Sequence, residues 1–493
     1  MAPDRRLVLV FVVDGLRPDS ITVEDTPTLF RLRAEGVELT NGHAVFPTVT
    51  RVNAAAIATG TQPGTNGLVG NQMYVPAVDE RRAFDTGNYR NFLALDRASD
   101  GRVLEVPTLA ERLHARGLRL AGVSSGSTGS AFLLNPRAPA GVGALVNGYL
   151  DPGKTVAYPA AVSETILGRL GPAPVRAPGP ARFDESVNWT QRVLREVVLP
   201  ELEPAVIINW LTEPDHSQHH VGVGSPAARE ALRNDDREIA EVLAAVDRRG
   251  LGPSTSVLVI SDHGFTTNTA GVDVAGALVG AKLKAAPDST DVILASSGQA
   301  VALHVQGHDA ERIARLARFI QAQDWGGAVF AAGPVAGAFP LELIHVANRD
   351  RSPDLLFTFP WTSRRNAFGV RGTDLANVSA GGAPYASDHG SMSPWNVRNT
   401  FLAWGAGVKK GVTAGVPAGN VDVTPTVLAL LGVDGEGGLD GRVLTEALEG
   451  GPDPEQVPVE TRVHTAAAGG YRAALQISTV DGRRYVDKSW RLS

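Results

Sequence analysis

The sequence predicts an α/β protein with a doubly wound sheet core and a smaller inserted domain. Three apolar runs, residues 7–13, 205–211 and 256–260, have the length and the aliphatic, mostly β-branched content of buried parallel strands. Helical patterns lie between these runs, and strands that alternate with helices are typical of a doubly wound sheet. Ligands bind such sheets beyond the carboxyl ends of the strands, so the residues that follow each run are candidates for a binding site.

The first half of the chain alternates in this way from its start. After the strand at 7–13, a further strand is expected at 118–123. Helices are expected at 28–35, 53–58, 109–116, 189–198 and 227–247, and Ser225-Pro226 opens the last of these as a cap followed by a first-turn proline. Two stretches lack periodicity, the polar 72–105 and the Pro-, Gly- and Ala-rich 130–182, and both are interpreted as insertions.

The second half changes character after the third apolar run. A strand pair at 292–305 and a helix at 309–323 indicate an inserted cap domain over 266–380. The chain then returns with a strand at 400–404 and a helix at 427–431. The predicted organisation is a catalytic core at 1–265 and 381–460, the cap at 266–380, and a hairpin-like tail at 461–493 around Asp481-Gly482.

Composition excludes several classes of function. The chain has 493 residues, a net charge of −6 and no cysteine. This charge balance gives no footprint for nucleic acid or for an anionic membrane. Without thiolates, any metal ion must be held by His, Asp, Glu or hydroxyl groups. The oligomeric state stays open.

No membrane or export signal is expected from the N-terminal sequence. The apolar run Leu7 to Val13 is too short to span a bilayer, and no small-residue cleavage site follows it. We therefore expect a cytoplasmic protein on this sequence, or an extracytoplasmic one if the start has been trimmed.

Acidic and histidine residues gather where the predicted strands end. Asp14 follows the first run, Asp215 the second and Asp262-His263 the third, while His219 lies four positions after Asp215. A second Asp-His-Gly triplet contains His389. Oxygen and imidazole ligands suit two divalent ions, with zinc as the leading choice. Each residue alone has an ordinary alternative, since such an Asp often caps a turn, and His216 is a rival ligand to His219.

Thr50 precedes a segment of strong helix formers, Asn53 to Ala58. A helix start offers unpaired N–H groups and a positive dipole end, which favour an ionised hydroxyl and a bound phosphate. Thr50 is thus a candidate nucleophile. The alternative is that Thr50 simply caps the helix, which threonine often does.

The order of these residues resembles the alkaline phosphatase superfamily, and within it the nucleotide pyrophosphatase/phosphodiesterase branch. The resemblance spans roughly residues 7–445. The motifs that carry it are Val12-Val13-Asp14-Gly15, Thr50 with Asn53, Asn71-Gln72-Met73-Tyr74, Pro214-Asp215 with His219, Asp262-His263-Gly264, Asp422 with Pro425-Thr426, and Asp440-Gly441-Arg442.

The resemblance implies a role for each residue. Asp215, His219 and His389 would hold one zinc ion, while Asp14, Asp262, His263 and the Thr50 oxygen would hold the other. Thr50 would attack phosphorus and form a phosphoryl-threonine, and Asn71 with the Thr50 N–H would stabilise the non-bridging oxygens. The implied fold is the alkaline phosphatase type of α/β core, and the implied function is a two-metal phosphodiesterase or nucleotide pyrophosphatase with a phosphate ester, such as a nucleotide, as substrate.

The sequence departs from the motifs of the resembled families at two places, and these departures leave other substrate classes as alternatives. The diesterases carry an aromatic residue after the nucleophile, where this chain has Arg51. Threonine-type phosphomonoesterases carry a Lys-x-Arg pair, whereas the matching Ser124 to Gly129 has no basic residue and Arg137 lies further on. The alternatives are a phosphomonoesterase or phosphonate hydrolase with the same site, a phosphomutase, and a metal-binding relative without catalysis.

Overall fold

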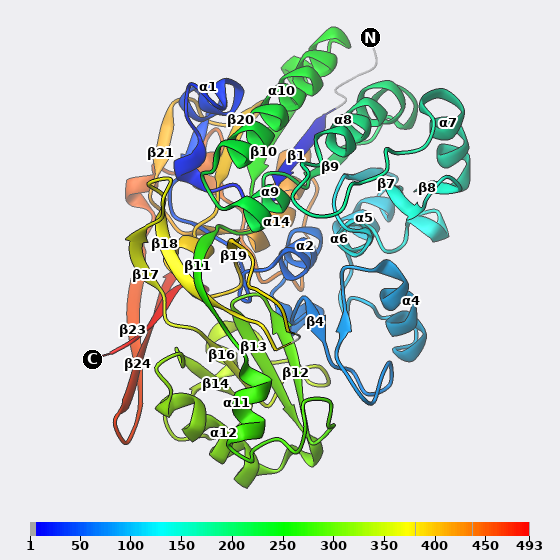
Figure 1. Ribbon diagram of the computed structural model, residues 1–493. Coiled ribbons are helices and arrows are strands. Elements are labelled where there is room, and N and C mark those ends of the chain that lie inside the picture. The colour runs from blue at the N-terminus through cyan, green and yellow to red at the C-terminus, as the bar shows by residue number, and fades with distance from the viewer. Residues whose placement is uncertain (1–5, 380, 436, 493) are drawn as a thin grey trace.

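The computed structural model describes residues 6–379, 381–435 and 437–492, so the first five residues of the predicted core lie outside the described part. A nine-stranded sheet forms the upper half of the molecule (Figure 1). Its strands, from edge to edge, are β21 (Val412–Ala414), β2 (Val37–Leu39), β20 (Phe401–Gly405), β10 (Thr255–Ile260), β1 (Leu7–Val13), β9 (Val206–Leu211), β6 (Leu120–Ser124), β7 (Ala144–Asp151) and β8 (Thr155–Tyr158).

Strand β1 lies at the centre of this sheet and is buried on both faces. Its side chains alternate between two hydrophobic cores, with Val8 and Val10 on one face and Leu9 and Phe11 on the other. One core includes side chains of α2 (Thr50–Thr59), α5 (Leu109–His114), α6 (Thr128–Leu134) and α14 (Val423–Leu431). The other includes α1 (Pro27–Glu35), α7 (Ala160–Leu170), α8 (Asp184–Val193) and α10 (Pro226–Arg248). The predicted doubly wound α/β core is therefore confirmed.

The direction of the central strands determines where the site forms. Strand β1 pairs in parallel with β10 on one side and with β9 on the other, and β9 pairs in parallel with β6. The carboxyl ends of these four strands consequently meet at one edge of the sheet. Strand β20 runs antiparallel to β10, so its amino end lies at the same edge.

The lower lobe in Figure 1 contains a second, five-stranded sheet. Its order is β12 (Val292–Ser297), β13 (Ala300–Val305), β16 (Leu355–Thr358), β14 (Val329–Ala331) and β15 (Phe339–Pro340). Together with α11 (Val274–Gly280) and α12 (Ala310–Ala322) it encloses a separate hydrophobic core. The predicted strand pair and helix of this region are both present, while the exact domain boundaries stay a prediction.

Two smaller sheets complete the molecule. One, of order β17 (Thr362–Arg365), β18 (Arg371–Asn377), β11 (Thr266–Val272) and β19 (Ser387–Asp388), lies between the two lobes. The other consists of β23 (Glu460–Ala468), β24 (Tyr471–Val480) and β25 (Arg483–Arg491), and the turn at Asp481-Gly482 joins its last two strands. The predicted tail hairpin is thus part of a three-stranded sheet, and its Tyr471 and Leu475 pack into the core of the lower lobe.

Two stretches are more regular than their composition suggested. Residues 130–182 contain β7 and β8, which extend the main sheet, and the helix α7. Residues 72–105 contain β4 (Gln72–Met73), β5 (Phe84–Asp85) and the helix α4 (Tyr89–Ala98), whose Phe92 and Leu95 are buried. These elements were not predicted because short elements stabilised by tertiary packing carry little periodicity of their own, and the interpretation of both stretches as insertions stays a prediction. No helix in the described part is long and apolar enough to cross a membrane.

Candidate metal and phosphoryl-transfer site

Three acidic residues meet at the carboxyl edge of the main sheet. Asp14 follows β1 directly, Asp262 follows β10 after one residue, and Asp215 begins the helix α9 (Asp215–Val221) that follows β9. His263 lies between them. Its Nε2 atom is 3.0 Å from Asp262 Oδ2, 3.6 Å from Asp14 Oδ1 and 3.9 Å from Asp215 Oδ1.

A second group forms around the same Asp215 carboxylate. Helix α9 places His219 one turn after Asp215, and the His219 Nε2 atom is 3.4 Å from Asp215 Oδ1. His389 approaches from the chain segment after β19, with its Nε2 atom also 3.4 Å from Asp215 Oδ1. The rings of His263 and His389 stack at 3.5 Å between centroids, so the two groups are contiguous.

Hydrogen bonds from outside the cluster orient all three imidazoles. The Nδ1 atom of His263 lies 3.0 Å from the Gly264 carbonyl, that of His219 3.1 Å from the Ser387 carbonyl, and that of His389 2.9 Å from the Thr48 carbonyl. An Nδ1–H that donates to a carbonyl leaves Nε2 as a lone-pair ligand, and each Nε2 points into the cluster.

The carboxylates are oriented in a similar way, by residues that the sequence analysis did not single out. The Trp210 indole Nε1–H donates to Asp14 Oδ2 at 2.9 Å, and the Gly15 N–H donates to Asp262 Oδ1 at 3.0 Å. Trp210 lies inside an apolar strand, where the sequence shows only a large hydrophobic residue. Nothing in its spacing indicates a donor to a residue that lies 196 positions away.

Three carboxylate oxygens of the cluster have no hydrogen-bond partner. Asp14 Oδ1, Asp215 Oδ1 and Asp262 Oδ2 are buried and accept no hydrogen bond from any described residue. Buried carboxylate oxygens without partners are costly unless a cation compensates them. Two groups have ligand atoms close enough to share an ion, namely Asp215 with His219 and His389, and Asp14 with Asp215 and His263. The donor set therefore fits divalent cations, and Asp215 lies within reach of both positions.

Without cations, the acidic and basic groups of the cluster shift one another's pKa values strongly. Burial, with the charges of Asp262 and Asp215, raises the pKa of Asp14 well above its ordinary value. Burial would also raise the pKa of Asp215, but His219 and then His389 hold it well below the ordinary range. Burial opposes protonation of His219, yet the neighbouring Asp215 raises the pKa of His219 to about 9. Metal ions would replace these protons, because ligating imidazoles are neutral.

Thr50 faces this cluster from the first turn of α2. Its Oγ1 lies 3.3 Å from His263 Nε2, and its side chain makes no capping bond, because the N-cap position belongs to Val49. The interpretation of Thr50 as a plain cap is therefore wrong. The Asn71 Oδ1 atom accepts the Arg51 N–H at 3.1 Å, which leaves the Asn71 Nδ2–H₂ group without an acceptor among the described residues. Asn71 is thereby placed beside the helix start that carries Thr50.

The rival histidine lies elsewhere. His216 Nε2 is 3.0 Å from the Ala181 carbonyl, and its ring stacks on Phe183 at 3.6 Å between centroids. Burial, with the charge of His220, lowers the pKa of His216 to about 4. The structure thus brings His219, and not His216, to the Asp215 carboxylate.

Three arginines occupy different positions around the site. Arg51 lies next to Thr50, and its guanidinium is 3.5 Å from the exposed Asp85 carboxylate. Arg137 is a surface residue that contacts Gly101 and Glu111, so it takes no part in the site. Arg176, which the sequence analysis missed, donates to the carbonyl of Ser125 in the loop after β6. Arg176 lies in a Pro- and Gly-rich segment 51 positions after Ser125, so no local pattern in the sequence indicates this contact.

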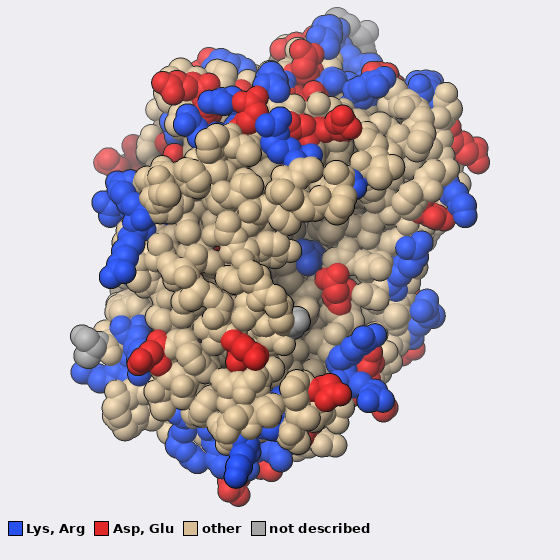
Figure 2. Space-filling model, viewed as in Figure 1, with Lys and Arg blue, Asp and Glu red and all other residues tan. Residues whose placement is uncertain are grey.

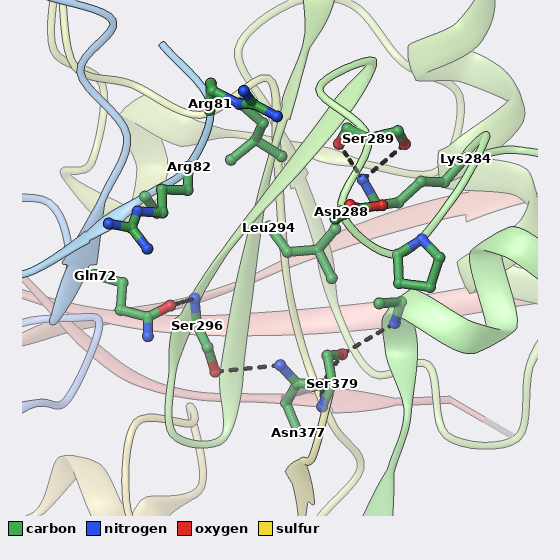
Figure 3. Close-up of a pocket in the computed structure, with 14 residues that line it drawn as sticks. Gln72, Arg81, Arg82, Lys284, Asp288, Ser289, Leu294, Ser296, Asn377 and Ser379 are labelled. Carbon is green, nitrogen blue, oxygen red and sulfur yellow. Dashed lines mark hydrogen bonds between the residues drawn. The ribbon is translucent and has the colours of Figure 1, made fainter. Parts of the chain in front are cut away.

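Pockets beside the site contain basic and polar side chains. Figure 2 shows a hollow in the middle of the face, over the region of α2 and β4 in Figure 1. A cavity of about 490 Å³ is lined by Gln72, which follows Asn71 in the chain, and by Arg81, Arg82 and Lys284 (Figure 3). The Lys284 ammonium is occupied by the carbonyls of Ser289 and Val292, whereas the arginines extend along the opposite wall of the cavity.

Comparisons with known proteins agree on one group of proteins. A family model described as type I phosphodiesterase / nucleotide pyrophosphatase matches residues 8–362. A venom phosphodiesterase of Naja atra is 23% identical over 269 residues, which are 53% of this chain and 26% of that protein. Human ectonucleotide pyrophosphatase/phosphodiesterase family member 5 is 22% identical over 282 residues, which are 54% of this chain and 46% of that protein.

A solved structure shares the fold. The human ectonucleotide pyrophosphatase / phosphodiesterase 5 structure superposes with a TM-score of 0.59 at 16% identity, over 88% of this chain and 96% of that chain. In sequence, by contrast, the aligned part spans less than half the length of these curated relatives.

Proposed function

Since the chain belongs to the type I phosphodiesterase / nucleotide pyrophosphatase family, we propose that it is a two-metal hydrolase of phosphoric ester bonds. The observation that carries this proposal is the buried cluster of three carboxylates and three imidazoles, which contains unpartnered carboxylate oxygens and contacts the Thr50 hydroxyl through His263. A cluster of this kind needs cations, and the hydroxyl beside it needs activation.

Two cations, with zinc as our choice, would be held by side chains already in position. One would take Asp215, His219 and His389, and the other Asp14, Asp262, His263 and the Thr50 oxygen, with Asp215 near both. When bound, the cations supply Lewis acidity, which makes the Thr50 hydroxyl more acidic and offsets charge on the oxygens around phosphorus. Imidazole and carboxylate ligands without thiolates are compatible with this choice of metal.

Thr50 is the proposed nucleophile. Its Oγ1 attacks phosphorus, the bond from phosphorus to the leaving oxygen breaks with its electron pair on that oxygen, and the Thr50 proton passes to solvent. The oxygen of a water molecule then bonds to phosphorus, the bond from phosphorus to the Thr50 oxygen breaks, and that oxygen takes up a proton as the phosphate product leaves. The Asn71 amide and the Thr50 N–H, which has no acceptor in the described part of the chain, are the proposed donors to the non-bridging oxygens.

A phosphodiester is the proposed substrate class, with nucleotides as candidates. The Arg176 guanidinium lies at the loop after β6, where its Nη2 group donates to the Ser125 and Gly126 carbonyls and its Nε and Nη2 groups donate to Ser186. The donors on these two nitrogens are already used within the protein, which disfavours Arg176 as the partner for the second charge of a phosphomonoester. The exposed Arg81 and Arg82 in the cavity lined by Gln72 suit the additional phosphates of a nucleotide.

One observation favours a second candidate function. Arg51 has a buried Nε without an acceptor, and among the described residues its one ionic partner is the solvent-exposed Asp85. This guanidinium could instead bind the additional charge of a phosphomonoester or of a phosphonate that carries a carboxylate.

Metal content and parallel kinetics test the proposal. The chain, purified without chelator and loaded with zinc, should contain about two ions per molecule and should hydrolyse bis(p-nitrophenyl) phosphate faster than p-nitrophenyl phosphate. The Arg51→Ala variant tests the second function. If this variant loses monoester turnover but keeps diester turnover, Arg51 binds the additional charge of the monoester. Full diesterase activity after exhaustive chelation would refute the metal-dependent mechanism.

A further inference from the structure

Aromatic side chains are exposed beside one half of the site. Among the described residues, the aromatic side chains with large exposure are Phe30, Phe368 and Tyr385, at 36%, 47% and 51%. Phe368 and Tyr385 both lie next to helix α9, which carries the candidate ligands Asp215 and His219. Large apolar surface left in water close to a reactive site is a common sign of ligand binding.

Tyr385 contacts the histidines of α9 directly. Its ring centroid lies 4.8 Å from that of His219 and 5.4 Å from that of His220. The backbone around it is fixed, because the Tyr385 carbonyl accepts a bond from Asn268 and the next N–H donates to the His219 carbonyl. The Tyr385 hydroxyl, by contrast, makes no hydrogen bond within the described part of the chain. The ring is thus held in place while its outer face stays open.

Phe368 reaches the same location from the turn between β17 and β18. Asn366 fixes this turn, since its side chain donates to the Val223 carbonyl just after α9 and accepts from the N–H groups of Phe368 and Val370. Gly222 ends α9, and a Cβ added there would lie 3.3 Å from the Phe368 ring and 4.0 Å from Ala386. Phe368 and the Tyr385 segment therefore flank the same end of the helix.

The position of these rings relative to the reaction suggests what they bind. In an in-line displacement the attacking and leaving oxygens lie on opposite sides of phosphorus. Thr50 attacks from the side of His263, so the leaving group departs toward Asp215, His219 and His389. A group that leaves past His219 meets Tyr385 next, whereas Arg51 directly follows Thr50 in α2 and so lies on the side of the attacking group.

We propose that Tyr385 and Phe368 form a subsite for the leaving group and select leaving groups that carry a planar aromatic ring. This inference rests on the proposed hydrolase function and adds the substrate feature recognised on the far side of the scissile bond. Tyr385 supplies the larger share, because it is more exposed and lies against His219.

The test compares two diesters that differ only beyond the leaving oxygen. Methyl benzyl phosphate carries an aromatic ring there, and methyl cyclohexylmethyl phosphate carries a saturated ring of similar size. For the zinc-loaded chain we expect a higher kcat/KM on the benzyl ester. Tyr385→Ala should lower the benzyl-to-cyclohexylmethyl ratio roughly three- to tenfold, the contribution of one aromatic contact, and Tyr385→Phe should keep most of it. Phe368→Ala should give a smaller decrease.

A binding measurement and a control accompany the kinetics. Analogues in which a methylene group replaces the scissile oxygen should show the same preference for the benzyl compound in calorimetric Kd values, and Tyr385→Ala should lower this preference by a similar factor. Phe30→Ala is the matched control, because Phe30 is also an exposed aromatic residue but lies on α1 beside Arg33. An unchanged ratio in Tyr385→Ala, with zinc content intact, would overturn this inference alone. Hydrolysis of neither ester by the wild type would overturn the proposed function as well.

Discussion

Replacement of Thr50 by valine separates chemistry from stability. Valine keeps the branched shape of threonine and removes only the hydroxyl. In the structure this hydroxyl contacts His263 Nε2 at 3.3 Å and caps nothing, while the side chain is 6% exposed. Its loss leaves no backbone donor or acceptor unsatisfied, so the free energy of unfolding should change by less than about 1 kcal/mol. Loss of the nucleophile should raise the reaction barrier by about 5 kcal/mol or more, roughly a 10,000-fold loss of turnover.

Thr59→Val in the same helix is the matched control. The Thr59 hydroxyl donates to the Ala55 carbonyl at 2.7 Å and lies 2.8 Å from the Thr61 hydroxyl, far from the metal ligands. Its removal leaves buried groups unpaired, which costs about 1–3 kcal/mol of stability and leaves turnover of the folded protein intact. The two variants should therefore show opposite signatures.

The assay measures diester turnover, zinc content and urea-induced unfolding for both variants. Thr50→Ser is included as an intermediate, since it keeps a hydroxyl that rotates more freely. A Thr50→Val protein that binds zinc and turns over within about tenfold of the wild type would refute the covalent mechanism. Direct attack by water would then be the remaining route.

Three further perturbations follow from the geometry. His219→Ala should reduce the zinc content by about one ion and abolish most activity, whereas His216→Ala should retain both, because His216 bonds to the Ala181 carbonyl. Atomic absorption and turnover measurements test this, and reversed results for the two variants would refute the ligand assignment. Trp210→Phe should weaken zinc binding about 10- to 100-fold in a chelator competition, since Asp14 loses its orienting donor, and an unchanged affinity would contradict this role. Burial lowers the pKa of His304 to about 4, so the unfolded state binds a proton first and the free energy of unfolding should fall as the pH decreases from about 6.5 to 4. Urea titrations at pH 7 and pH 5 should show this fall reduced by on the order of 1–3 kcal/mol in His304→Phe, and an equal fall in the variant and the wild type would refute the prediction.

Much of the fold follows from local patterns. The run Leu7 to Val13 is apolar on both faces, and the strand β1 occupies the same residues with both faces buried. The long helix predicted at 227–247 is α10, Pro226–Arg248, because its cap and its apolar spacing are local signals. Strand ends after such runs lie at a common edge whenever the strands are parallel, so Asp14, Asp215 and Asp262 could be placed near each other before any coordinates.

Other features depended on tertiary structure. The Arg176 contact with the loop after β6, the Trp210 bond to Asp14 and the position of Tyr385 beside His219 each join residues far apart in sequence. Strands β7 and β8 were missed because their stability comes from pairing at the sheet edge and not from their own periodicity. The sequence by itself thus determined the elements and the residue types at the strand ends, since those depend on local burial and spacing. Only the tertiary structure decided which histidine faces Asp215, which arginines are occupied and which aromatic rings border the site, because these depend on packing between distant segments.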